Sequence, residues 1–334
     1  MMTVPEQATT PLESNPPHNT AHNPPKLAIA VSIVLCVVFI AAVLLGARII
    51  MDRNTYTPVG VSPVLAPYAE SAACTSFTES MPDKMDDYTK VEIVDPAPAG
   101  VTAYRNSEGT ALTVRCGVNV PAEYTVLSTS HDEGGLEWFS VKDDTPGSNL
   151  STHYQVTGTP VIAVTSEAPI GSALADISAA GGSSIDDREA PQPQAFPLST
   201  TRLENDGHPR SCKALLDALP DSMGEFTAKD VSQLEGAPSQ SKVWVADDRE
   251  PIVLRCGVEV PESFEPGAML DQVNDVPWYS EPDPAKGPTS GRYYALGREA
   301  IVALYMPGTD GNDIVTTITK AIEDNLDEEK MPEQ

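Results

Sequence analysis

Basic side chains are scarce in this chain of 334 residues, which has 21 Lys and Arg against 48 Asp and Glu and a net charge of −27 at pH 7. Such a charge disfavours binding to nucleic acid and to anionic lipid headgroups, and it favours solubility or cationic partners. The segment up to Arg53 is neutral, so the whole excess of acidic residues follows it. The simplest interpretation is a solvated acidic surface.

Histidine is also scarce, with five residues. The sequence contains no Gly-x-Ser-x-Gly, no phosphate-binding Gly-x-x-x-x-Gly-Lys-Ser/Thr and no His-Glu-x-x-His motif. His131-Asp132-Glu133 is either a small metal or acid–base cluster or, more commonly in a glycine-rich loop, a solvated turn. We therefore expect no cofactor, no metal and no enzymatic activity. An envelope-associated hydrolase with an unrecognised site is the alternative.

A long run without charged residues extends from Leu27 to Ala47. As a helix it would span roughly 31 Å, which matches the hydrocarbon core of a bilayer. A cleaved signal peptide would have a shorter apolar region followed by small residues, whereas Arg48-Ile49-Ile50 follows here. We predict a single-pass transmembrane helix. The polar, proline-containing segment before it is predicted to be disordered.

The orientation of this helix rests on two opposing signals. Arg48 and Arg53 outnumber Lys26, which favours a cytoplasmic C-terminal part under the positive-inside rule. Four cysteines in matched positions beyond the helix instead favour an oxidising compartment. Because long domains translocate largely regardless of flanking charge, we predict a cytoplasmic N-terminus and extracytoplasmic C-terminal domains.

A short signature occurs twice: Arg115-Cys116-Gly117-Val118 and Arg255-Cys256-Gly257-Val258. Each copy also has an earlier cysteine, so the sequence contains an internal duplication with two cysteines per copy. We predict one disulfide in each copy, Cys74 to Cys116 and Cys212 to Cys256; buried free thiols are the alternative. A zinc site would need cysteine and histidine at short spacing, which is absent here.

Secondary-structure signals follow the same order in both copies. Cys212, Leu215, Leu216 and Leu219 have helical spacing and precede Pro220, so the early cysteine is predicted on the buried face of a helix. The signature cysteine is predicted at the end of a strand. Predicted strands are 101–105, 110–120, 138–141 and 154–164 in the first copy, and 242–246, 251–260, 278–280 and 294–305 in the second. A closing helix is predicted at 170–180 and at 313–325.

The predicted fold class is α+β: one N-terminal transmembrane helix followed by two tandem duplicated domains, each an antiparallel sheet with an N-terminal helix, a C-terminal helix and one disulfide. The predicted organisation is a disordered cytoplasmic tail (1–26), the transmembrane helix (27–47), a stalk (48–68), a first repeat (69–180), a linker (181–208), a second repeat (209–325) and an acidic tail (326–334).

The spacing of an early cysteine, a hairpin aromatic, Arg-Cys-Gly-Val, a Trp and a late Gly-Arg resembles the actinobacterial domain of unknown function 3515. The second repeat matches with Cys212, Trp244, Cys256, Trp278 and Gly297-Arg298. The first repeat departs, with Tyr104 in place of the hairpin Trp and Thr157-Gly158 in place of Gly-Arg. The resemblance implies a cell-envelope protein, usually membrane-anchored or exported, with no established activity.

The predicted function is a binding or assembly module for an envelope protein or a wall component, and the candidate binding residues are in the better matching copy: Arg255, Trp244, Trp278 and Arg298. A guanidinium beside the disulfide suits a carboxylate ligand. The alternative is structural, with the arginines paired to acidic residues of their own domain and the tryptophans packed in the core.

Overall fold

The computed structural model describes residues 26–331, apart from 144, 146, 206, 248, 266, 282–289 and 309–310. The tail predicted to be disordered lies outside the described residues except for Lys26. The chain divides into two compact units, Met1–Arg53 and Asn54–Gln334, and each is described by itself. Both predicted repeats lie in the second unit.

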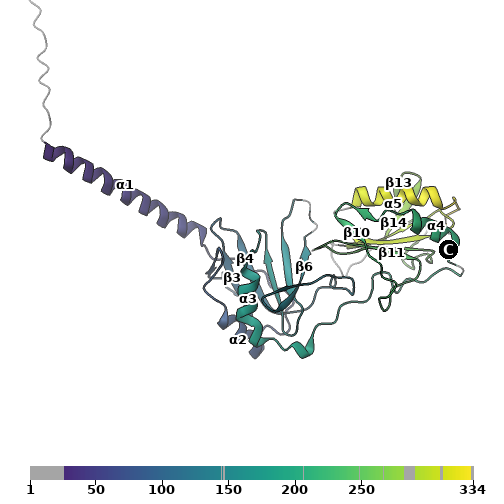
Figure 1. Ribbon diagram of the computed structural model, residues 1–334, viewed down its shortest axis with the longest axis horizontal. Helices are drawn as coiled ribbons and strands as arrows, with labels where there is room; N and C mark the ends of the chain where they lie inside the picture. The colour runs from purple at the N-terminus through teal and green to yellow at the C-terminus, as the bar shows by residue number, and fades with distance from the viewer. Residues whose placement is uncertain are drawn as a thin grey trace, which may run out of the picture. The chain divides into compact units, whose positions relative to one another are not determined.

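The first unit contains most of a single helix, α1 (Lys26–Thr55), which extends beyond the predicted span at its C-terminal end (Figure 1). Its Ile29–Met51 segment is long and apolar enough to cross a membrane, and none of it is buried inside the protein. This composition suits either a membrane anchor or a signal sequence. Cys36, the free cysteine, is exposed on this helix.

Each repeat folds as an eight-stranded, fully antiparallel sheet with the same strand order. The first sheet runs β1-β2-β3-β4-β8-β7-β6-β5 and the second runs β9-β10-β11-β12-β16-β15-β14-β13 with the direction reversed. Strands of the first sheet are β1 (Lys84–Met85), β2 (Tyr88–Val91), β3 (Val101–Arg105), β4 (Ala111–Val118), β5 (His131–Glu133), β6 (Leu136–Lys142), β7 (Ser151–Gln155) and β8 (Val161–Ser166). Strands of the second are β9 (Ser222–Met223), β10 (Phe226–Ala228), β11 (Ser241–Val245), β12 (Ile252–Cys256), β13 (Asp271–Val273), β14 (Val276–Glu281), β15 (Ser290–Ala295) and β16 (Val302–Pro307).

Two helices contribute to the core of each repeat, one before the sheet and one after it. The first repeat has α2 (Ala72–Ser80) and α3 (Ala173–Gly181), and the second has α4 (Pro209–Ala218) and α5 (Gly311–Asn325). Apolar residues of both helices join alternate residues of the central strands in one buried cluster per repeat. The predicted α+β class, with one antiparallel sheet and a helix at each end of each repeat, is confirmed.

Two predicted strands were wrong in the same way. The segments 154–164 and 294–305 were each predicted as one strand, but each contains parts of two strands that run antiparallel, β7 with β8 and β15 with β16. In the second repeat the reversal falls at Gly297, whose φ of +72° lies in the left-handed region. Apolar residues continue on both sides of each reversal, so the hydrophobic pattern did not reveal it.

The linker and the terminal segments also contact the repeats. Two short 3₁₀ helices, Gly182–Ser184 and Asp187–Glu189, begin the linker. Further along, Phe196 and Leu198 are buried in a cluster with residues of the second sheet. In the predicted acidic tail, Leu326 belongs to the core of the second repeat.

Candidate functional site

The two signature cysteines form the predicted disulfides. Cys74 bonds to Cys116 and Cys212 bonds to Cys256, across sequence separations of 42 and 44 residues. All four are buried. Each bond joins the first helix of its repeat to a central strand, so the signature lies where the chain entering that helix crosses the sheet.

The signature glycine permits this crossing. Gly117 and Gly257 have φ values of +84° and +77°, which L side chains rarely adopt. A Cβ on Gly117 would lie 2.4 Å from the backbone nitrogen of Ala69, and one on Gly257 would lie 2.2 Å from the carbonyl oxygen of Gly207. The backbone that leads into each helix therefore passes directly against the signature glycine.

The signature arginine of the second repeat binds the same incoming chain. Arg255 is 7% exposed. Its Nη1 donates to the carbonyl oxygens of Leu198, at 3.0 Å, and Thr201, and its Nε donates to that of Ser239 at 3.3 Å. These acceptors are main-chain carbonyls, whereas the structural alternative in the sequence analysis had a carboxylate. Burial lowers the pKa of this guanidinium.

Arg115 occupies the matching place in the first repeat with different surroundings. Its Nη1 is buried and has no hydrogen-bond partner among residues 26–331 as described. Burial lowers the pKa of this guanidinium, and the neighbouring Tyr154 acts in the opposite direction. Arg115 also lines a pocket of about 230 Å³ beside the disulfide. The two signature arginines thus share a position and differ in their partners.

The hairpin aromatics make equivalent contacts in both repeats. The indole N–H of Trp244 donates to the carbonyl oxygen of Pro220 at 2.9 Å, and the hydroxyl of Tyr104 donates to that of Pro82 at 2.9 Å. Both side chains are fully buried, and each proline follows the first helix of its repeat. The first repeat has Tyr104 where the second has Trp244, and the hydrogen bond to the proline carbonyl is therefore preserved.

The second pair of matched aromatics connects the sheet to the closing helix. The indole N–H of Trp278 donates to Oγ1 of Thr319 at 3.0 Å, and that of Trp138 donates to Oγ of Ser178 at 3.1 Å. Trp278 is 2% exposed and Trp138 is fully buried. These tryptophans pack in the cores of their repeats.

Arg298 holds the C-terminal end of the second repeat. It is 8% exposed, and its guanidinium donates to the carbonyl oxygens of Leu326, at 3.4 Å, and Asp275, at 3.3 Å. Its Nε is buried without a hydrogen-bond partner in the part of the chain that the structure describes. Arg298 also forms an isolated backbone bridge with Glu328. All four candidate binding residues have intramolecular partners, and their role in binding a ligand stays a prediction.

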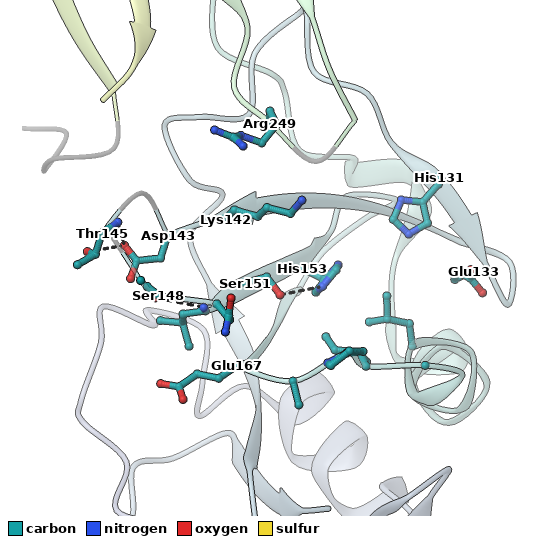
Figure 2. Close-up of a pocket in the computed structure, with 18 residues that line it drawn as sticks. His131, Glu133, Lys142, Asp143, Thr145, Ser148, Ser151, His153, Glu167 and Arg249 are labelled. Carbon is teal, nitrogen blue, oxygen red and sulfur yellow. Dashed lines mark hydrogen bonds between the residues drawn. The ribbon is translucent and has the colours of Figure 1, made fainter. Parts of the chain in front are cut away.

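A larger cavity is lined mainly by residues of the first repeat, together with Arg249 of the second, and the sequence analysis had placed no binding residue in it. Its volume is about 860 Å³, and Figure 2 shows the polar side chains around it. His153 accounts for much of its chemistry: Nδ1 shares a 2.7 Å hydrogen bond with the buried Ser140, and Nε2 lies 3.4 Å from Oγ of Ser151. Ser140 and His153 are directly opposed on β6 and β7, so recognising that hairpin would have placed them together.

The histidine cluster considered in the sequence forms part of this cavity. His131 and Glu133 line it from β5, since residues two apart on a strand face the same side. Asp132 accepts a 3.4 Å hydrogen bond from the backbone nitrogen of Gly135 instead. On the opposite side, hydrogen bonds from Ser148 and Thr145 lower the pKa of Asp143. The described residues include no group of three His, Cys, Asp or Glu placed to hold a metal ion.

The comparisons with known proteins agree with the repeated geometry. The family model described as "Protein of unknown function (DUF3515)" matches twice, over residues 33–190 and 186–331. The chain belongs to the DUF3515 family. Searches of the curated proteins and of the solved structures found no match. Both DUF3515 matches contain a complete set of signature residues, disulfide and eight-stranded sheet, which confirms the tandem copies.

Proposed function

We propose that this protein is a single-pass membrane protein of the cell envelope that holds two disulfide-bonded repeats outside the cytoplasm as a binding module. The observation that carries the proposal is the order of the chain: a 30-residue helix with an apolar, unburied segment precedes two repeats with one buried disulfide each. Buried disulfides form and persist in oxidising compartments. An apolar helix with no protein cover matches a bilayer.

Binding is the activity that the repeats suit best. Two copies of one scaffold on a single chain give avidity when both engage a partner. The net charge of −27 favours partners with basic surfaces. Two pockets are lined mainly by the first repeat: the cavity around His153, to which Arg249 of the second repeat also contributes, and the smaller one beside Arg115.

The topology is tested by labelling single cysteines in intact cells that express the protein. In a Cys36→Ala background, Gln192→Cys places a thiol at an exposed linker position, and Thr20→Cys places one before α1. A membrane-impermeant maleimide should label Gln192→Cys in intact cells and Thr20→Cys only after lysis. The reverse pattern would refute the proposed orientation. Loss of the N-terminal segment from the mature chain would identify α1 as a signal sequence.

One observation favours a second candidate, an envelope hydrolase. Ser151, His153 and Ser140 form a chain of hydroxyl, imidazole and hydroxyl at the larger cavity, with distances of 3.4 and 2.7 Å. A hydroxyl next to an oriented imidazole is the arrangement that activates a serine nucleophile. A fluorophosphonate probe should then label the wild-type protein and not Ser151→Ala. Equal labelling of both proteins, or of neither, would eliminate this candidate.

A further inference from the structure

The two signature arginines occupy equivalent positions and have different access to acceptors. Arg255 pairs across the sheet with Ser241 and Ala303, and Arg115 pairs with Val101 and Ala163 in the same arrangement. Arg255 donates to three main-chain carbonyls. Arg115 has a buried Nη1 with no acceptor within the described part of the chain. A buried, charged donor is costly to leave unpaired, so Arg115 lacks the compensation that the three carbonyls give Arg255.

The difference arises from the path of the chain that enters each repeat. Counted back from the helical cysteines, Leu198 and Thr201 correspond to Gly60 and Pro63. In the first repeat the chain just before these positions bonds to another segment: Val59 donates to the carbonyl of Glu92 at 2.9 Å and accepts from Val94 at 3.0 Å. No carbonyl of the incoming chain is bonded to Arg115 among the hydrogen bonds of the described residues.

A pocket of about 230 Å³ adjoins Arg115. Besides the guanidinium, one charged residue lines it, the exposed Glu70. Its other walls are mainly small or apolar: Val64, Ala66, Pro67, Pro98, Ala99 and Val101. The position of Ala99 matches that of Ser239, whose carbonyl binds Arg255. The first repeat therefore has a cavity beside the arginine, where the second repeat has its own linker bound.

We propose that this pocket binds an extended peptide segment of a partner protein, with a main-chain carbonyl of that segment accepting a hydrogen bond from Arg115. The second repeat shows the same guanidinium position binding the carbonyls of an extended chain, Leu198 and Thr201. The apolar walls suit short side chains. Glu70 and the net charge of −27 disfavour a free anion. The inference rests on the proposed function, because it names the kind of partner that the binding module takes.

The test uses a synthetic peptide with the sequence of residues 196–203, the segment that fills the matching place in the second repeat. The full-length protein in detergent is titrated with the fluorescently labelled peptide. Hydrogen–deuterium exchange then maps the protected residues. The peptide should bind with saturation and slow exchange at 64–70 and 99–101. Arg115→Gln should weaken binding about tenfold or more, as expected for the loss of a charge-assisted hydrogen bond.

Two further variants separate a lost contact from a lost fold. Arg188→Gln removes the same charge at an exposed arginine, 84% exposed in its side chain, and should leave binding unchanged. Ala99→Trp fills the pocket from an exposed wall and leaves Arg115 in place, so it should also abolish binding. Saturable binding that neither Arg115→Gln nor Ala99→Trp weakens would overturn the proposal, and so would absence of peptide binding. Displacement of the bound peptide by sodium acetate would indicate an anion site and would also overturn the proposal.

The peptide-binding test does not depend on the membrane topology of the protein. A peptide that binds the purified protein through Arg115 supports the pocket even if labelling places the repeats in the cytoplasm. Labelling that places the repeats outside the cytoplasm, together with absence of peptide binding, would support the topology and reject the pocket as a binding site. The two proposals can therefore fail separately.

Discussion

The two repeats share a scaffold, and one position at which they differ is the surroundings of the signature arginine. In both, a disulfide joins the first helix to the sheet, the signature glycine lets the incoming chain pass, and a buried aromatic donates to the proline carbonyl after that helix. The residue type can change without loss of the contact, as Tyr104 and Trp244 show. The signature arginine differs instead in its partners: the linker supplies carbonyl acceptors to Arg255, whereas the described residues supply none to the buried Nη1 of Arg115.

The largest expected effect is the loss of a disulfide, and it should be equal in the two repeats. Cys74→Ala with Cys116→Ala opens a separation of 42 residues, and Cys212→Ala with Cys256→Ala opens one of 44. The chain-entropy model gives a destabilisation of about 4 kcal/mol for each. Urea unfolding under non-reducing conditions measures it. A loss confined to one repeat would contradict the shared scaffold.

The signature glycines should come next. Gly117→Ala and Gly257→Ala combine a positive φ with a backbone atom within 2.4 Å of the new Cβ, so we expect each to cost about 3 kcal/mol. Gly135 is the matched control, since its φ is +87° and a Cβ there would meet nothing within 4 Å. Gly135→Ala should cost only about 1 kcal/mol. Thermal and urea unfolding measure these losses of stability. Equal losses at all three glycines would mean that the close approach of the incoming chain to the signature glycine is unimportant.

A smaller effect is expected at the acceptors of the core tryptophans. Ser178→Ala and Thr319→Val each leave a buried indole N–H without its partner. We expect each to destabilise the protein by about 1.5 kcal/mol. Calorimetry of the two variants and of the wild type checks this. A difference between them larger than about 1 kcal/mol would mean that the closing helices of the two repeats are not equivalent.

The smallest effect concerns alkaline pH. Burial, with a further contribution from Glu281, raises the pKa of Tyr294 to about 12 from an ordinary value of 10.0, and burial also raises that of the matching Tyr154. A raised folded-state pKa gives stability that is complete below the unfolded-state pKa and is lost as the pH rises through the folded-state value. Stability should therefore fall between pH 10 and 12, and less so in Tyr294→Phe.

The titration of Tyr154 also tests the position of Arg115. Its guanidinium lowers the pKa of Tyr154, so Arg115→Gln should raise that pKa further and leave Tyr294 unchanged. Phenolate absorbance against pH, with Tyr154→Phe and Tyr294→Phe as assignments, measures both. Ionisation of Tyr294 at its ordinary value would refute the buried environment.

The sequence predicted the duplication, both disulfides, the fold class, strand 101–105 and, as 138–141, most of strand β6. These features depend on local pattern and on matched cysteines. It missed the short strands β1, β2 and β5 and their counterparts, which have two to four residues. Periodicity needs longer segments than these. It also joined strands across Gly158 and Gly297, where apolar residues continue through the turn.

The candidate site was less accessible from sequence, because a partner distant in the chain decides the role of each arginine. Arg115 and Arg255 are both followed by Cys-Gly-Val in the sequence, and the path of the incoming chain distinguishes their surroundings. The His153 cavity likewise depends on the register that places Ser140 opposite His153. The asymmetry between the repeats had suggested the second as the binding copy. Pockets occur in both repeats: the cavity around His153 and the pocket beside Arg115 are lined mainly by the first, and one of about 560 Å³ is lined by residues 228–243 of the second.

Urea unfolding of Arg115→Gln and Arg255→Gln, measured side by side in the full-length protein, tests the central comparison most directly. Arg255→Gln removes a charged donor from three carbonyls and should destabilise the protein by about 3 kcal/mol. Arg115→Gln removes a guanidinium whose buried Nη1 has no hydrogen-bond partner among the described residues, and it should change stability by less than about 1 kcal/mol. Equal losses for the two variants would contradict an arginine held by the linker in one repeat and open to a partner in the other.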